Sequence, residues 1–133
     1  DVFNGRAGDD VMSGLSGNDT FELRDRDDSD SISGGDGWDT VAYIGTSNAI
    51  ADLDAGTFTG RGIAADLVGI EGVSTGGGAD RLRGNGEDNS ATLGGGADRG
   101  QGASGSDWLY GGDGDDKLTG NGGNDLLSGD AGD

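Results

Sequence analysis

The chain has 133 residues, of which 32 are glycine, 26 are acidic and 8 are basic, and its formal net charge is −18. It contains no cysteine, histidine or proline, which excludes a cysteine nucleophile, a serine–histidine–aspartate triad, a disulfide framework and a zinc site of the usual nitrogen and sulfur type. The negative charge disfavours nucleic-acid binding, and we expect no membrane insertion because no apolar run approaches the roughly 20 residues of a membrane helix.

Hydrophobic residues make up 30% of the chain and aromatic residues 5%, which is a small supply for a globular core. High charge combined with low hydrophobicity is typical of a disordered segment. Such a chain can still fold if something neutralises its aspartates. The pattern of those aspartates therefore decides between disorder and a defined fold.

The N-terminal segment repeats every nine residues. Residues 5–13 read GRAGDDVMS, residues 14–22 read GLSGNDTFE and residues 34–42 read GGDGWDTVA, while residues 1–4 fit the end of a preceding unit. Each full unit has glycine first and fourth, aspartate sixth and an apolar residue eighth. The first six residues are typical of a turn, because glycine supplies positive φ and aspartate and asparagine tolerate it. The last three predict a short strand whose eighth residue points inward.

Between residues 22 and 30 the glycines disappear and the sequence ELRDRDDSD interrupts the repeat. Asp19 and Asp30 are 11 residues apart, so this turn is enlarged by two residues if Asp30 resumes the sixth position. Ile32 then points inward at the eighth position. We assign residues 1–43 to a first block of repeats.

The nonapeptide is absent from the middle segment, residues 44–75. Three runs predict longer strands there, at residues 40–44, 49–55 and 65–73, and the alternation at residues 50–53 is typical of a half-buried strand. We expect the segment to stay in the same stack of coils with wider coils. A separate small hairpin insertion is the alternative.

A second block of repeats occupies residues 76–133. Its clearest units are GASGSDWLY at residues 102–110, GGDGDDKLT at 111–119 and GNGGNDLLS at 120–128, followed by the partial unit GDAGD. Their period and their glycine, aspartate and apolar positions are those of the N-terminal units. We therefore expect the two blocks to form coils of the same kind.

Two units of the second block are degenerate. The unit at residues 84–92 has Asn89 at its sixth position and Ala91 at its eighth, and the next unit has Asp98 and Gly100 there. Small residues at inward positions predict a poorly filled coil. We expect this to be the weakest region of the second block.

The consensus G-G-x-G-x-D-x-U-x, in which U is apolar, resembles the RTX (repeats-in-toxin) calcium-binding nonapeptide repeat. The resemblance implies an all-β fold, a right-handed parallel β-roll in which two units form a coil of about 18 residues and calcium ions lie between successive turns. It also implies type I secretion of an unfolded chain and folding outside the cell.

In such a roll the sixth-position side chains form two columns, because units 18 residues apart lie on the same side. One column contains Asp80, Asp98 and Asp116 and the other Asn89, Asp107 and Asp125, while Asp1 and Asp19 share a side opposite Asp10. Carboxylates stacked at the strand spacing of about 4.8 Å repel each other, and the 8 basic residues do not compensate the 26 acids.

A hard divalent cation between the carboxylates removes this repulsion. Ca²⁺ accepts roughly six to eight oxygen ligands from carboxylates and backbone carbonyls, whereas Mg²⁺ prefers a smaller and more rigid octahedron. We therefore expect several Ca²⁺ ions. The expected side-chain ligands are Asp1, Asp10, Asp19, Asp30, Asp39, Asp80, Asn89, Asp98, Asp107, Asp116 and Asp125. The expected carbonyl ligands are those of Gly5, Gly14, Gly34, Gly102, Gly111, Gly112 and Gly120.

Acidic side chains outside the sixth position are weaker candidates. A solvated turn residue explains each of them at least as well as a calcium ligand does. They are Asp9, Asp113 and Asp115 in the turns, and Asp52, Asp54, Asp66 and Glu71 in the middle segment.

We expect no enzymatic activity, because no acid stands in an evidently apolar pocket and the run TGGGAD lacks the lysine of a phosphate loop. Trp108 and Tyr110 flank the inward Leu109 and should face solvent, and Trp38 lies in a turn. Such aromatic side chains can stack on sugars or contact a protein, although scattered surface aromatics are common.

The function expected from these features is a calcium-binding structural module of a secreted RTX protein, located outside the cell or on its surface. Two alternatives stay open: an adhesin or surface-layer assembly module with glycan or protein contacts, and an accessory domain of a secreted hydrolase or polysaccharide-modifying enzyme. Both chain ends fall within a repeat and no terminal cap is visible, so we expect a larger parent chain and allow end-to-end or lattice self-assembly through exposed strands.

Overall fold

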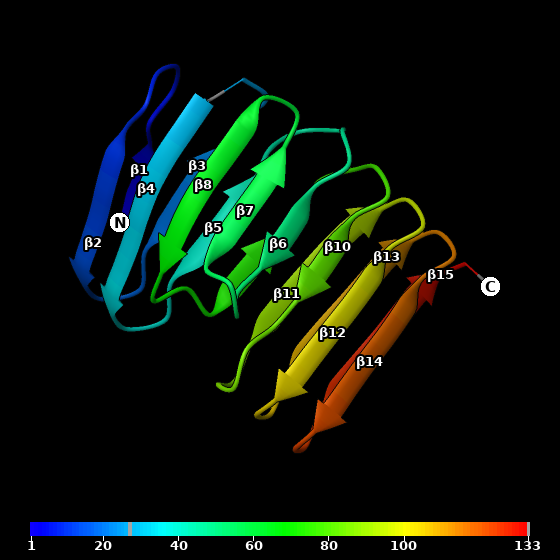
Figure 1. The fold of residues 1–133 in the computed structure, drawn as a ribbon. Coiled ribbons are helices and arrows are strands. Elements are labelled where there is room, and N and C mark those ends of the chain that lie inside the picture. Colours follow the sequence, from blue (N-terminus) through cyan, green and yellow to red (C-terminus); the bar gives the residue numbers. More distant parts are fainter. Residues whose placement is uncertain (27, 133) are drawn as a thin grey trace.

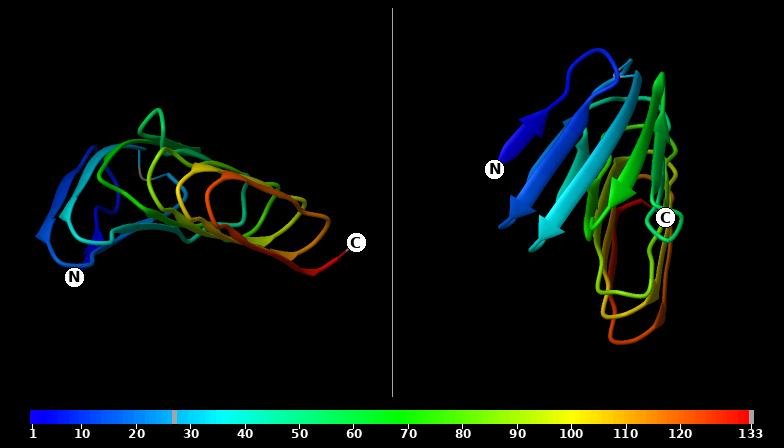
Figure 2. Two further views of the ribbon diagram at one scale, coloured as in Figure 1. Left: turned by 90° about the horizontal axis from the view of Figure 1, so that it is seen from below. Right: turned by 60° about the vertical axis from the view of Figure 1, so that its left-hand side comes forward.

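The computed structural model describes residues 1–26 and 28–132. The enlarged turn that we predicted at residues 22–30 and the partial unit at 129–133 are therefore described except for Asp27 and Asp133, which lie outside these ranges. The described residues form strands joined by turns, and among them there is no helix with the length and hydropathy to cross a membrane. The strands stack as successive coils along one axis, so that the N-terminus and the C-terminus lie at opposite ends (Figures 1 and 2).

One side of each coil belongs to a seven-stranded sheet in the order β1-β3-β5-β9-β11-β13-β15, in which every pairing is parallel. We refer to it as sheet A. Its strands are β1 (Val2–Asn4), β3 (Thr20–Leu23), β5 (Thr40–Tyr43), β9 (Gly72–Ser74), β11 (Ser90–Gly95), β13 (Trp108–Asp113) and β15 (Leu126–Ala131).

The other side belongs to an eight-stranded sheet, sheet B, in the order β14-β12-β10-β6-β7-β8-β4-β2. Its pairings are parallel except for β6 with β7 and β7 with β8, which are antiparallel. Its strands are β2 (Val11–Ser16), β4 (Asp28–Asp36), β6 (Ile50–Asp52), β7 (Thr57–Gly60), β8 (Ile63–Val68), β10 (Arg81–Arg83), β12 (Arg99–Ser104) and β14 (Lys117–Gly122). The all-β, parallel β-roll predicted from the nonapeptide is confirmed.

The register between coils follows the repeat. In the C-terminal block, residues 18 apart are partners, as in the pairing of Ala91 with Leu109. In sheet B the partner of Met12 is Ile32, 20 residues away, because the enlarged turn adds two residues to this coil. Asp30 and Ile32 thus occupy the sixth and eighth positions, as the spacing predicts, and both are buried.

The middle segment combines an antiparallel meander with continuity of the stack. β6, β7 and β8 lie side by side within sheet B, while sheet A passes directly from β5 to β9. The hydrophobic pattern did not predict β7, and it predicted β8 and β9 as one run at residues 65–73. The two strands are separate because the chain turns at Gly69, whose φ of 61° lies in the left-handed region that glycine adopts readily.

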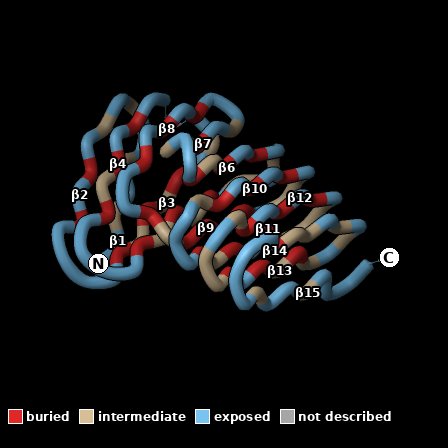
Figure 3. The backbone as a smooth tube through the Cα atoms, turned by 60° about the horizontal axis from the view of Figure 1, so that its bottom comes forward, coloured by how far each residue is buried: buried red, intermediate tan, exposed pale blue. Residues whose placement is uncertain are grey.

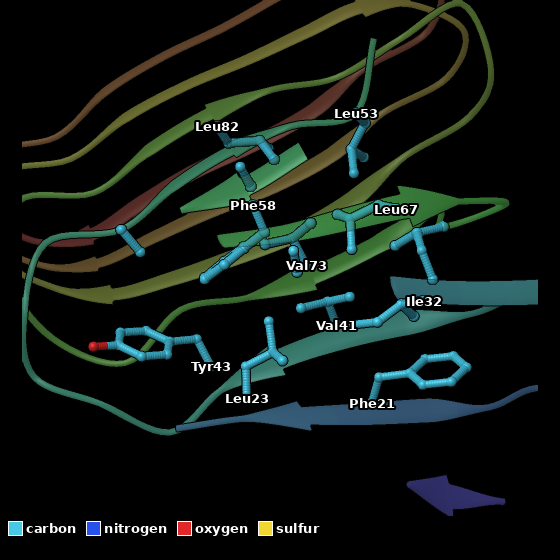
Figure 4. Close-up of a cluster of buried hydrophobic side chains, with 14 of the residues drawn as sticks. Phe21, Leu23, Ile32, Val41, Tyr43, Leu53, Phe58, Leu67, Val73 and Leu82 are labelled. Atoms are coloured by element: carbon cyan, nitrogen blue, oxygen red, sulfur yellow. The ribbon is translucent and has the colours of Figure 1, made fainter. Parts of the chain in front are cut away.

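The core is a single file of inward side chains between the two sheets. It is widest at the middle segment, where Phe58 and Leu23 are fully buried and Tyr43 packs against Phe58 with ring centroids 5.7 Å apart (Figure 4). Burial decreases toward the C-terminal end, where Leu126 and Leu127 are exposed (Figure 3).

The prediction of a poorly filled coil at the degenerate units is wrong. Leu93 replaces glycine at the first position of its unit, and its side chain is completely buried. A side-chain carbon placed on Gly100 would lie only 3.0 Å from Leu118 and 3.4 Å from Leu93. The space left by Gly100 is therefore occupied by leucines that project from neighbouring positions.

Candidate metal sites

The sixth-position aspartates lie in two columns, one at each side of the roll, and each is linked to the next coil. The Oδ1 atom of Asp98 accepts a hydrogen bond from the backbone N–H of Asp80 at 2.7 Å, and Asp107 accepts one from Asn89 at 2.9 Å. The same pattern recurs in the N-terminal block, where Asp39 accepts from the N–H of Asp19 at 2.8 Å. One carboxylate oxygen per turn is thereby used to hold consecutive coils together.

In most of these carboxylates the second oxygen has no hydrogen-bond partner. Among the described residues, the buried side-chain oxygens without a hydrogen bond are all Oδ2 atoms of sixth-position aspartates. Burying a carboxylate oxygen without a donor is costly, and such atoms call for an explanation such as a bound ion. The residues concerned are Asp10, Asp19, Asp30, Asp39, Asp80, Asp98, Asp107 and Asp116.

The first-position glycines create the space that these oxygens occupy. A side-chain carbon on Gly111 would overlap with Oδ2 of Asp116, five residues later in the same turn. Glycine therefore recurs five residues before most of these aspartates, although Thr75 and Leu93 occupy that position before Asp80 and Asp98. The same close approach joins Gly5 to Asp10, Gly14 to Asp19, Gly34 to Asp39, Gly102 to Asp107 and Gly120 to Asp125.

Burial disfavours the ionised form of the column carboxylates. Desolvation raises the pKa of Asp80, Asp98 and Asp107 above that of a free aspartate, and the next carboxylate in the column adds to the rise. The hydrogen bonds from backbone N–H groups act in the opposite direction but do not cancel the effect. A cation beside Oδ2 would reverse this balance by favouring the charged form.

Glu71 extends one column through the middle segment, although its position outside the nonapeptides made it one of the weaker candidates. Its Oε2 atom accepts a hydrogen bond from the N–H of Asp39 at 2.9 Å, which is the role that aspartate plays elsewhere in the column. The available signal was its position 18 residues before Asn89. The column on this side runs through Asp1, Asp19, Asp39, Glu71, Asn89, Asp107 and Asp125.

The opposite column is interrupted at the middle segment. Ala65 pairs with Asp30, and the N–H of Ala49 donates to Asp80 at 2.7 Å, so alanines stand where the column would continue. Asp10 and Asp30 are thus separated from Asp80 and the aspartates that follow it. Any series of ions on this side is divided into two parts.

The remaining acids are placed differently. Asp52 and Asp54 pair with Arg83 on the surface, at 3.5 Å and 2.9 Å. The carboxylate of Asp9 accepts a hydrogen bond from the N–H of Ser29 at 3.1 Å in an exposed turn, and Asp113 is exposed. None of these side chains has the buried, unpartnered oxygen that distinguishes the columns.

The residues fit a hard cation that draws on the backbone. Within the ranges described, no three acidic side chains are grouped so that they alone could hold a metal ion. The columns instead offer single carboxylates at successive turns, next to glycines whose carbonyls can be approached closely. Ca²⁺, which accepts carbonyl as well as carboxylate oxygens in a flexible shell, suits this set better than Mg²⁺.

The family model described as RTX calcium-binding nonapeptide repeat matches four segments of the chain, residues 1–21, 22–43, 74–107 and 101–133. These segments cover well over half of the chain and leave residues 44–73 unmatched. A comparison with curated proteins gives no match. The matched segments contain every sixth-position aspartate of the two columns.

A substitution in a column should weaken ion binding more than one in an exposed turn. Asp116→Ala removes a buried, unpartnered Oδ2 and the acceptor of the Asp98 N–H, which lies at 2.9 Å. We expect calcium affinity at the C-terminal coils to fall about tenfold, because ligand charge sets affinity at such sites. Asp113→Ala is the control with the same change in charge. Equal affinities of the two variants in a calorimetric calcium titration would show that the columns are not the ligands.

The raised pKa values predict opposite pH dependences with and without metal. In chelator, a carboxyl group whose pKa is higher in the folded state than in the unfolded state takes up a proton on folding. Its contribution to the stability of the fold is therefore complete below the unfolded pKa of about 3.9 and is lost as the pH rises through the folded pKa. We therefore expect more β-structure at about pH 4 than at about pH 7 without calcium. With calcium the order should invert, because protons compete with the ion. Circular dichroism at both pH values tests this, and β-structure that is independent of pH in chelator would contradict it.

Proposed function

Because the chain belongs to the RTX calcium-binding nonapeptide repeat family, whose repeats bind calcium ions between successive turns, we propose that it is a calcium-dependent structural module of a secreted protein. A β-roll of such repeats is a structural calcium-binding domain. In the proposed cycle, the chain crosses the low-calcium cytosol unfolded, leaves the cell by type I secretion and folds outside. In this cycle calcium is the ligand, and its higher concentration outside the cell is also the signal that starts folding.

The unpartnered Oδ2 atoms of the two columns carry this proposal. They place eight buried carboxylate oxygens in one roll without a donor. When bound, Ca²⁺ supplies the positive charge that these oxygens lack. The chain supplies the carboxylates and the glycine turns that let carbonyls approach. Its ligands in this proposal are the sixth-position residues named above and the carbonyls of Gly5, Gly14, Gly34, Gly102, Gly111, Gly112 and Gly120, with Glu71 added to the side chains.

Folding and ion binding become one process in this arrangement. The unfolded chain carries no preformed site, so the free energy of binding contributes directly to the stability of the folded state. The two repeat blocks, residues 1–43 and 76–133, would bind the ions together with Glu71. Apart from Glu71, residues 44–75 would act as an apolar spacer that connects the two blocks, with Phe58 and Leu67 buried in its meander.

Far-UV circular dichroism during addition of calcium to chelator-treated protein tests the proposal. We expect a cooperative change from coil to β-structure with calcium and little change with the same concentration of magnesium. A spectrum that is already rich in β-structure at neutral pH in chelator would instead indicate a preformed scaffold. A spectrum that stays coil-like with calcium would indicate a disordered acidic segment.

We propose glycan binding as a second function, because one observation favours it. Trp38 and Trp108, which lie 70 residues apart in sequence, line a single cleft of about 400 Å³ together with Asp88, Asn89 and Ser106. Both rings are partly exposed, Trp38 by 38% and Trp108 by 56%. Two aromatic walls with polar groups between them match the apolar faces and the hydroxyls of a sugar.

The double variant Trp38→Ala and Trp108→Ala should lose glycan binding and keep its calcium-induced folding. A glycan array gives the first result and circular dichroism the second. The matched control is Val11→Ala with Val68→Ala, which removes exposed apolar side chains at 87% and 67% exposure outside the cleft. Absence of any bound glycan, or equal binding by the two double variants, would refute this second function.

A further inference from the structure

Four of the eight basic residues of this acidic chain line one groove on the outer face of sheet B. The groove has a volume of about 460 Å³ and crosses β6, β10, β12 and β14. Arg81 and Arg83 come from β10, Arg99 from β12 and Lys117 from β14. In a chain of net charge −18, this concentration of positive charge on one face is a local reversal of the average.

The strand register sets the shape of the groove. Arg81 pairs with Arg99, and Arg99 pairs with Lys117, so these three cations form a ladder along the axis of the roll. We refer to Arg81, Arg99 and Lys117 as the cationic ladder. Its rungs are separated by the strand spacing of about 4.8 Å.

The opposite wall of the groove is neutral beside Arg99 and Lys117, whereas beside Arg81 it carries Arg83, which is paired with Asp52 and Asp54. Gln101 lies two residues after Arg99 and Thr119 two residues after Lys117, so both project from the same outer face. Between the walls the side chains of Leu82 and Leu118 point inward, and Gly100 has none. The floor is therefore bare backbone, and the groove is open along the axis of the roll.

The ladder is not neutralised within the part of the chain that the structure describes. Arg83 forms ion pairs with Asp52 and Asp54, at 3.5 Å and 2.9 Å, whereas the three ladder residues have no ion pair there. Like charges directly opposite each other on neighbouring strands are destabilising. This acidic chain has many carboxylates that could pair with such cations. Because the cations of the ladder are instead stacked on one another, the arrangement favours the binding of an anion from outside the chain.

We propose that this groove binds an acidic polysaccharide, whose chain lies along the axis of the roll. Its carboxylate or sulfate groups would meet the cationic ladder, one every strand or every second strand. Its hydroxyls would face Gln101 and Thr119 on the neutral wall. An acidic polypeptide fits less well. Its backbone N–H and C=O groups would need a regular row of hydrogen-bond partners, which Gln101 and Thr119 alone do not provide. This binding goes beyond the calcium-dependent folding proposed above, although it requires the folded roll.

The test uses calcium-loaded protein and short oligosaccharides in calorimetric titrations. The probes are an oligogalacturonate for carboxylates, a dextran sulfate of similar length for sulfates, neutral dextran and polyglutamate. The variant Arg81→Gln, Arg99→Gln and Lys117→Gln removes the ladder. The matched control is Arg6→Gln, Arg24→Gln and Arg61→Gln, three exposed positions outside the groove with the same loss of charge.

We expect at least one of the two acidic oligosaccharides to bind, with an affinity that falls as salt rises. The ladder variant should bind about tenfold more weakly or worse, and its affinity should depend less on salt, while the control variant should stay within about twofold of the unchanged protein. The tighter of the two acidic probes identifies the anionic group. Neutral dextran should not compete.

Three results would overturn the proposal. The first is that neither acidic oligosaccharide binds, and the second is that polyglutamate binds as tightly as they do. The third is that the ladder and control variants bind with equal affinity, which is the result expected if calcium bridges the oligosaccharide to the turns and the ladder takes no part. Failure of the calcium-binding proposal is recognised separately, because the protein would then not gain β-structure with calcium.

The single variant Arg99→Gln guards against a folding defect in the triple variant. It removes the middle rung between two like charges, so calcium-induced folding at low salt should be retained or improved. Its affinity for the acidic oligosaccharide should still fall several-fold. Loss of folding in this variant would show that the ladder is a structural feature and would contradict the proposal.

Discussion

The structure depends on one constraint: most turns bury a carboxylate whose second oxygen has no hydrogen-bond donor. The first oxygen is satisfied by the N–H of the preceding coil, so the aspartates fix the register of the stack as well as its charge. Most of these turns have glycine five residues earlier, where a side-chain carbon would collide with the carboxylate, although Leu93 stands there before Asp98. The nine-residue repeat thus reflects the geometry of the coil, because the turn, the strand and the position of the carboxylate depend on one another.

This coupling explains which features could be predicted from the sequence. Period, inward positions and columns follow from spacing alone, and Asp30 was placed correctly across the enlarged turn because the count of residues resumes there. The filling of the coil at Gly100 could not be predicted from the eighth position, because Leu93 reaches it from a position that is glycine in the consensus. Glu71 was underrated since its neighbours do not form the nonapeptide, although its distance from Asn89 is one coil.

The middle segment makes the two sides of the roll unequal. On the side of Glu71 the acidic column continues from one repeat block to the other, and sheet A is parallel throughout. On the other side the antiparallel meander inserts β7 between β6 and β8, and alanines replace the carboxylates. Apolar burial around Phe58 takes the place of ion binding there. A chain with few hydrophobic residues thereby concentrates them where its repeat is absent.

The charges of the chain are divided between two environments, and this division links the two proposed ligands. The acids of the columns lie in the turns, whereas the cationic ladder lies on the outer face of sheet B. Calcium in the turns would cancel much of the negative field that repels a polyanion, while leaving the ladder unchanged. It would also hold β10, β12 and β14 in the register that stacks the cations. Calcium should therefore strengthen the binding of an acidic polysaccharide and, by linkage, the polysaccharide should strengthen the binding of calcium.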